Sequence, residues 1–271
     1  MVESLKELNK ICQKPRYKEV GNWMVRNILR DAALPITWLL LHTSVTANQV
    51  TLFSLILGLA GISFFMLPGA GWFLAGALFL QIWYLLDHVD GQIARYRKTA
   101  SMTGRFFDFV MHHILHGALL FPLGYYAYFR TKDELFILWG FAAAFSMTVF
   151  NMLYDVQYKT YFEKLSQMKS VEIMQPSPLP SPATQERGKR SERHFFSLLH
   201  KACEMHVMMN VLTGAALLEF FLLKTVDTRF FLFLFYGLAA PCIAIVKISY
   251  WIKTKKIDQE FYHSYQERPN T

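Results

Sequence analysis

The stretches TLFSLILGLAGISFFML (residues 51–67) and GWFLAGALFLQIWYLL (residues 71–86) decide the fold class. Each approaches the length of about 20 residues that a helix needs to cross the apolar core of a bilayer. Pro68 and Gly69 interrupt the apolar run between them, and residues of these two types typically turn the chain. The two stretches therefore predict a helical hairpin inside a membrane.

Four further apolar blocks follow the hairpin, at residues 106–129, 135–154, 207–223 and 230–252. Six such blocks in 271 residues leave too few polar side chains to cover a soluble globule. Only 18% of the residues are charged, whereas soluble domains carry about 25%. We therefore expect an all-α integral membrane protein with six transmembrane helices, and we expect no nucleic-acid partner.

Positive charges give the orientation. Of the 28 Lys and Arg residues, 24 fall on the side of the membrane that holds both ends of the chain and the loops at residues 87–105 and 155–205. Short cytoplasmic segments collect Lys and Arg. The pattern predicts a multi-pass protein whose termini and site face the cytoplasm.

The apolar blocks divide the chain into three parts. Residues 1–45 form a cytoplasmic N-terminal segment, residues 46–252 a six-helix transmembrane catalytic domain, and residues 253–271 a cytoplasmic tail. A proline-rich stretch at about residues 165–195 predicts a largely disordered cytoplasmic loop within the second part.

The N-terminal segment contains an amphipathic pattern. Val20, Trp23, Met24 and Ile28 share one face of a predicted helix, and polar residues occupy the other face. This pattern suits a helix that lies in the membrane interface before the first span. An ordinary amphipathic helix packed on protein gives the same pattern.

Ionisable residues concentrate in DHVDGQIARYRKTASMTGRFFDFVMHH, residues 87–113, where the second span ends and the third begins. Asp87 and Asp90 lie on one helical face, while Asp108 and His112 lie one turn apart on the next helix. Because the connection between the two helices is short, we expect the three carboxylates to converge.

Three carboxylates at membrane depth repel one another unless something neutralises them. A divalent cation such as Mg²⁺, Mn²⁺ or Ca²⁺ prefers carboxylate oxygens and commonly bridges them to substrate phosphates. Basic residues surround the same place and could hold phosphate oxygens, or they could reflect only the cytoplasmic charge bias: Arg95, Arg97, Lys98 and Arg105.

These residues resemble the signature of the CDP-alcohol phosphotransferase (CDP-alcohol phosphatidyltransferase) family, Asp-x2-Asp-Gly-x2-Ala-Arg-x8-Gly-x3-Asp-x3-Asp. The matching positions are Asp87, Asp90, Gly91, Ala94, Arg95, Gly104 and Asp108. TANQVT, residues 46–51, is similar to the Thr-Pro-Asn-x-Val-Thr element that opens the first span of the family, with Ala47 in place of proline. The resemblance covers about residues 15–155 and 206–252.

The resemblance implies metal-dependent transfer of a phospho-alcohol group from a CDP-alcohol to an acceptor hydroxyl, with release of CMP, in phospholipid or related lipid biosynthesis. It implies that at least one substrate is a lipid, and it allows a homodimer. It assigns Asp87, Asp90 and Asp108 to one or two Mg²⁺ or Mn²⁺ ions. It implies contacts to the nucleotide from Gly91, Ala94, Arg95, Gly104, Asn48 and Thr51.

The last aspartate of the signature is replaced by His112. In the family this acid is assigned as a metal ligand and as the base that deprotonates the acceptor. His112 keeps both roles in our preferred interpretation, since a neutral imidazole ligates metals and its reference pKa of about 6.5 suits a base. Asp108 and His112 are then the candidate catalytic residues. Alternatively, His112 only fills space, or the site has lost catalysis.

Two other classes of protein remain as alternatives. A transporter also uses acids inside the membrane, but its sites lie near the midplane between broken helices. A non-catalytic scaffold or binding protein accounts for His112 but not for the three preserved acids.

Overall fold

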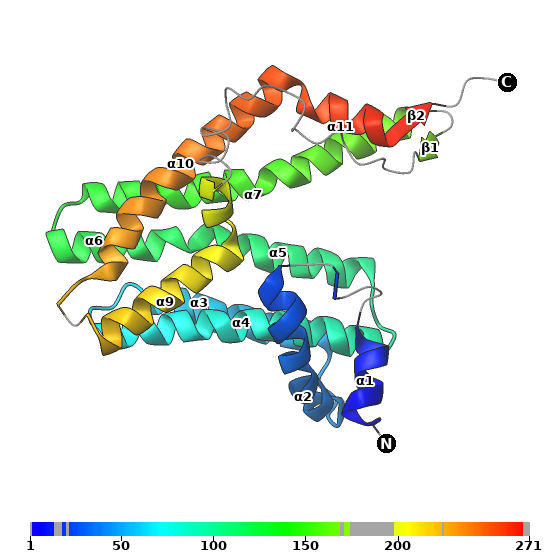
Figure 1. Cartoon of the computed structure of the whole chain (residues 1–271), viewed down its shortest axis with the longest axis horizontal. Helices are drawn as coiled ribbons and strands as arrows, with labels where there is room; N and C mark the ends of the chain where they lie inside the picture. Colours follow the sequence, from blue (N-terminus) through cyan, green and yellow to red (C-terminus); the bar gives the residue numbers. More distant parts are fainter. Residues whose placement is uncertain are drawn as a thin grey trace.

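The structure is a computed structural model, and it describes residues 2–13, 18–19, 22–168, 171–173, 198–223 and 225–267. Helices make up nearly all of this part of the chain (Figure 1). Most of the predicted proline-rich loop falls outside the described residues.

The N-terminal segment contributes α1 (Leu5–Cys12), a π-helical turn η1 (Val25–Leu29) and α2 (Arg30–Leu41). The long helices that follow are α3 (Ala47–Phe64), α4 (Ala70–Tyr96), α5 (Met102–Ala118), α6 (Leu120–Thr131), α7 (Leu135–Gln167), α9 (Met205–Phe221) and α10 (Thr228–Thr254). Helix α11 (Lys256–Ser264) and two short strands, β1 (Val171–Ile173) and β2 (Tyr265–Glu267), complete the described chain.

Five helical stretches of the described chain are long and apolar enough to cross a membrane: α3, α4, α5 with α6, α7 and α10. Helix α9 is also apolar but has 17 residues, and it corresponds to the fifth predicted span, residues 207–223. The prediction of an all-α, multi-pass membrane protein is therefore confirmed, with the fifth span shorter than the others.

The third predicted span consists of two helices. Helix α5 ends at Ala118 and α6 begins at Leu120, with Pro122 in the first turn of α6. Proline has no N–H to donate to the carbonyl four residues earlier, so the helix ladder breaks here. The single apolar block at 106–129 did not indicate this break.

Helix pairs organise the bundle. Helix α4 packs along α3 on one side and against α9 on another, while α7 packs along α6 and α10. Figure 1 shows α1 and α11 toward the same end of the molecule, on the right. Helix α4 ends and α5 begins at this end, which we call the motif end.

Glycine pairs allow two of these helix crossings to be very close. A Cβ atom at position 76 of α4 would lie 2.5 Å from the carbonyl oxygen of Gly61 on α3. A Cβ atom at position 124 of α6 would lie 2.5 Å from the Cα atom of Gly140 on α7. Small residues at such crossings let helix backbones pack directly in a membrane.

Gly124→Ala is therefore expected to lower the thermal midpoint of the purified protein in detergent by several degrees, because overpacking costs about 1–3 kcal/mol. Gly214→Ala on α9 is the matched control, since among the described residues nothing beyond its own helical turn lies within 4 Å of the added methyl group. Its midpoint should stay the same or rise, because alanine favours helix. Equal midpoints for the two variants would contradict the close crossing of α6 and α7.

The N-terminal helical run exposes part of its predicted apolar face. Trp23 is 65% exposed and Ile28 is also exposed, whereas Val25 and Leu29 are buried. Val20 lies outside the described residues. Exposed apolar side chains on Trp23 and Ile28 suit the interface helix, and the buried pair shows that the same run also packs on the protein.

At the other end of the sequence, β1 and β2 pair antiparallel, with Val171 opposite Glu267. Helix α11 joins the end of α7 through a hydrogen bond of 2.7 Å from the Gln157 side-chain amide to Glu260. The predicted tail is therefore tied to the extension of α7. Sequence patterns did not indicate either contact.

Candidate active site

Two helix ends carry the motif. The last turns of α4 hold Asp87 to Arg95, and the first turns of α5 hold Gly104 to His112. The Ser101 hydroxyl starts α5 by accepting the N–H of Gly104 at 3.0 Å, as an N-cap residue does. The loop between the helices is short, and it places the two parts of the motif next to each other.

Arg97 anchors this loop. Its two terminal nitrogens donate to the carbonyl oxygens of Val45 at 2.5 Å and Thr43 at 2.7 Å. The connection between α4 and α5 is thus fastened to the connection between α2 and α3. Because its terminal nitrogens already have acceptors, Arg97 holds the loop, although the sequence suggested it as a phosphate ligand.

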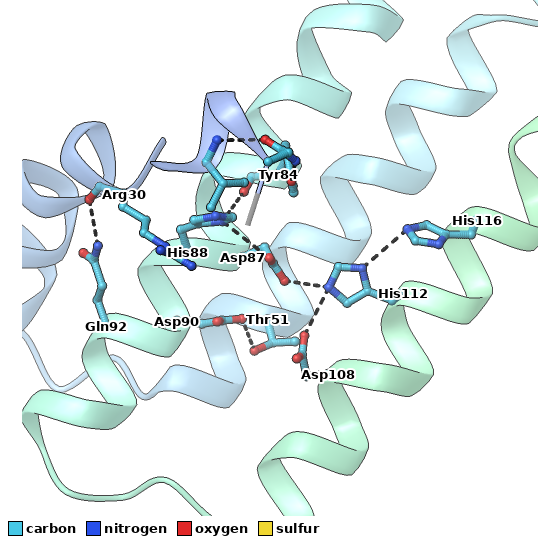
Figure 2. A network of polar contacts seen from close by, with 12 residues as sticks. Arg30, Thr51, Tyr84, Asp87, His88, Asp90, Gln92, Asp108, His112 and His116 are labelled. Atoms are coloured by element: carbon cyan, nitrogen blue, oxygen red, sulfur yellow. Dashed lines mark hydrogen bonds and ion pairs between the residues drawn. The ribbon is translucent and has the colours of Figure 1, made fainter. Parts of the chain in front are cut away.

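Asp87 and Asp108 meet at His112 (Figure 2). The Nε2 atom of His112 lies 2.7 Å from Oδ1 of Asp87 and 3.4 Å from Oδ1 of Asp108. One ligand atom from each of the three residues falls within 4.8 Å of the other two. Two carboxylate oxygens and an imidazole nitrogen at this separation can surround one metal ion.

Asp90 is held by a different helix. It is 7% exposed, and its Oδ2 atom accepts the hydroxyl of Thr51 on α3 at 2.5 Å. Helix α3 begins at Ala47, and Thr46 and Gln49 form a capping box at this start. Thr51 follows four residues after Ala47, in the second turn of the helix. The TANQVT element therefore reaches the motif by placing Thr51 beside Asp90.

The ring of His112 is fixed on its other side. Its Nδ1 atom lies 3.5 Å from Nε2 of His116, one turn deeper along α5. Trp83 of α4 meets the His112 ring edge-on at 5.2 Å and the His116 ring at 6.0 Å. His113 points elsewhere, since its Nε2 atom lies 2.7 Å from Asp155 on α7.

A cavity of about 740 Å³ opens beside the acids at the motif end. Its walls include nine predicted site residues: Asn48, Thr51, Asp87, Asp90, Gly91, Ala94, Arg95, Gly104 and Asp108. His112 is not among the described residues that line it, because the ring stands between the two acids, toward Trp83. Cavities of this size commonly bind small ligands.

Arg95 is directed by its surroundings. Its Nε atom donates to the carbonyl oxygen of Cys12 at the end of α1. A Cβ atom at position 91 would lie only 3.1 Å from a terminal nitrogen of Arg95, so Gly91 gives the guanidinium room. Burial raises the pKa of the Cys12 thiol to about 11 and keeps it neutral.

The structure also brings residues to the site that sequence patterns did not indicate. Gln13 and Arg30 from the N-terminal segment line the cavity, as does His88 of α4. Trp83 has no polar signal in the sequence, although its position one turn before Asp87 places it on the same helical face. Gln13 and Arg30 carried no periodic signal that could have linked them to the motif.

Comparison with known proteins finds a family model that matches part of the chain. Residues 44–174 match the family model described as CDP-alcohol phosphatidyltransferase. No curated protein sequence matches the chain.

Three solved structures of the phosphatidylinositol phosphate synthase PgsA1 from Mycobacterium tuberculosis are similar to the chain. The complex with manganese and citrate is 19% identical, covers 80% of this chain and 87% of its own, and has a TM-score of 0.51. The apo form is 20% identical, with 80% and 94% covered and a TM-score of 0.49. The form with CDP-DAG bound is 19% identical, with 88% and 94% covered and a TM-score of 0.49. The complex with manganese and citrate, which has the TM-score of 0.51, shows a shared helical fold.

Proposed function

We propose that the protein, whose residues 44–174 match the CDP-alcohol phosphatidyltransferase family model, transfers a phospho-alcohol group from a CDP-alcohol to an acceptor hydroxyl, with release of CMP. The observation that carries this proposal is the arrangement of Asp87, Asp90 and Asp108 beside one cavity, with His112 in contact with two of them. The reaction serves phospholipid or related lipid synthesis.

The donor set fits a divalent cation. The ligand atoms of Asp87, Asp108 and His112 lie close enough to share one ion, and oxygen with imidazole ligands suits Mn²⁺ and Mg²⁺. Manganese in the similar PgsA1 structure supports this choice. Held by these residues, such an ion would neutralise charge on the diphosphate oxygens and make the phosphorus more electrophilic.

The remaining residues align the donor. Asp90 is held in place by the Thr51 hydroxyl, so its carboxylate is preorganised before ligand enters. The small residues Gly91, Ala94 and Gly104 leave room for the donor beside the cavity wall. The guanidinium of Arg95 offers charge-assisted hydrogen bonds to a diphosphate. Asn48 lines the same cavity and completes the nucleotide contacts.

His112 acts as the base toward the acceptor hydroxyl. A neutral imidazole accepts a proton near pH 7, and because the Nε2 atom is turned toward the acids, this nitrogen serves as the base when Asp87 and Asp108 alone hold the ion. Contact with His116 holds the ring in this orientation. Phosphoryl-type transfer depends mainly on alignment and charge neutralisation, so the other residues need only position the reacting groups.

The membrane setting defines the partners. The long apolar helices support a site at a membrane, and we assign a lipid to at least one of the two substrates. The excess of Lys and Arg at the motif end supports a cytoplasmic site. We place both termini on the same side.

A second candidate function is a non-catalytic protein that binds a CDP-alcohol. One observation favours it: the replacement residue His112 stands beside the cavity and is not among the described residues that line it. This candidate requires nucleotide binding without turnover.

The test is CMP release by purified protein in detergent–lipid micelles, with a panel of CDP-alcohols and acceptors. We expect release that requires Mn²⁺ or Mg²⁺ and stops when EDTA is added. Binding of CDP without CMP release from any donor would favour the non-catalytic candidate, and absence of both would overturn the proposed site.

A further inference from the structure

One wall of the cavity comes from outside the family region. The matched residues are 44–174, whereas Gln13 follows α1 and Arg30 begins α2. Both line the cavity that holds the acids. The family signature therefore accounts for only part of the surface that a donor would meet.

The N-terminal segment is packed firmly onto the motif helix. Leu8 and Cys12 of α1, together with Ala33 of α2, are fully buried in a cluster with Val89 and Ile93 of α4. Burial of the Leu, Val and Ile side chains in this cluster contributes about 1.5–3 kcal/mol each. Helices α1 and α2 are therefore fixed relative to the motif.

A polar node fixes the backbone of Arg30. Gln92 of α4, which is 1% exposed, donates from its side-chain amide to the Arg30 carbonyl oxygen at 2.9 Å. Gln13 donates to the same carbonyl at 3.4 Å, and the Thr37 hydroxyl donates to the side-chain oxygen of Gln92 at 2.7 Å. The backbone from which the Arg30 side chain starts is thus set by three side chains.

The side chain of Arg30 extends from this node toward His88, as Figure 2 shows. It approaches the cavity from α2, while Arg105 approaches from α5 and Arg95 from α4. Arg97, at the end of α4, also lines the cavity and holds the loop through two carbonyl oxygens. Four arginines from α2, α4 and α5 therefore surround the space beside the acids.

Arg95 depends on the same segment. The carbonyl of Cys12 that accepts its Nε–H is at the C-terminal end of α1, where helix carbonyls carry partial negative charge. No other hydrogen bond of Arg95 is found among the described residues, so its terminal nitrogens can serve a ligand. Helix α1 thereby positions a motif residue.

We propose that the N-terminal segment forms a second recognition wall for the CDP donor, in which Arg30 contacts the diphosphate and the Cys12 carbonyl positions Arg95. The inference rests on the proposed function, because it assumes a cytidine diphosphate group in this cavity. A guanidinium offers paired N–H donors that match phosphate oxygens. A diphosphate between the acids and Arg30 would face cations on both sides once a metal ion is bound.

Isothermal titration of the purified full chain with CDP and with cytidine, both in the presence of Mn²⁺, tests this wall. Arg30→Gln should weaken CDP binding about ten-fold or more and change cytidine binding less than two-fold, because only CDP carries the diphosphate. Arg30→Lys should lie between wild type and Arg30→Gln, since lysine keeps the charge but not the paired donors.

Arg26→Gln is the matched control. Arg26 stands one turn before Arg30 in the same helical run, and it does not line the cavity. Its affinity for CDP should equal that of the wild type.

Two outcomes overturn the inference alone, provided that the wild type binds CDP: unchanged CDP affinity in Arg30→Gln, or an equal loss for CDP and cytidine. A wild-type protein that does not bind CDP would overturn the proposed function together with this inference.

Discussion

Asp87→Asn is expected to lower metal-dependent CMP release by about 10²–10³-fold, the scale for removing one preorganised group that stabilises charge. Asparagine has the size of aspartate, but it lacks the charge that attracts a cation. Asp87 also lies 2.7 Å from His112 and lines the cavity, so one substitution affects both the metal site and the base. Turnover assays and Mn²⁺ binding followed by electron paramagnetic resonance measure the two effects.

Asp155→Asn provides the control for this variant. Asp155 also lies 2.7 Å from a histidine, His113, but it is exposed on α7 and does not line the cavity. The same chemical change should leave CMP release and Mn²⁺ affinity unchanged. Turnover of Asp87→Asn within ten-fold of wild type would show that the metal is held elsewhere.

His112→Ala is the second large effect. The variant is expected to lose turnover by about 10²–10⁴-fold, the usual contribution of a general base. CDP binding should change little, because His112 stands behind the acids and is not among the described residues that line the cavity. Comparing kcat with the dissociation constant for CDP separates the two quantities.

His113→Ala is the neighbouring control, since its side chain contacts Asp155 and points away from the acids. Full activity in His112→Ala would remove His112 from the mechanism.

His112→Asp compares the two chemistries of this position. Retained or improved turnover would mean that the position accepts either a carboxylate or an imidazole as base. If the wild type binds CDP without turnover and His112→Asp releases CMP, the non-catalytic function would be favoured. The histidine would then be the change that ended catalysis.

Much of the fold could be predicted because membrane helices are encoded locally. Apolar runs of sufficient length predicted the spans. The short link between α4 and α5 predicted that Asp87 and Asp108 lie close together. The break at Pro122 was missed because both halves of the block are apolar, and hydropathy alone does not register a lost hydrogen bond.

The N-terminal wall could not be predicted for a different reason. Gln13 and Arg30 reach the cavity only because α1 and α2 fold back onto α4. This is a tertiary contact between segments more than 60 residues apart, such as Arg30 and Gln92. Neither periodicity nor motif spacing records such a contact. Likewise, the orientation of His112 depends on its ring contact with Trp83. In the sequence, Trp83 is only one more apolar residue of the second span.

The hydrogen bond between Thr51 and Asp90 couples two separate sequence elements in evolution. A lineage that replaced the threonine by a residue without a hydroxyl would leave a buried carboxylate with one donor fewer, at a cost of about 1–3 kcal/mol. A substitution at either position should therefore be accompanied by a substitution at the other. We expect homologous chains either to keep both residues or to replace both together.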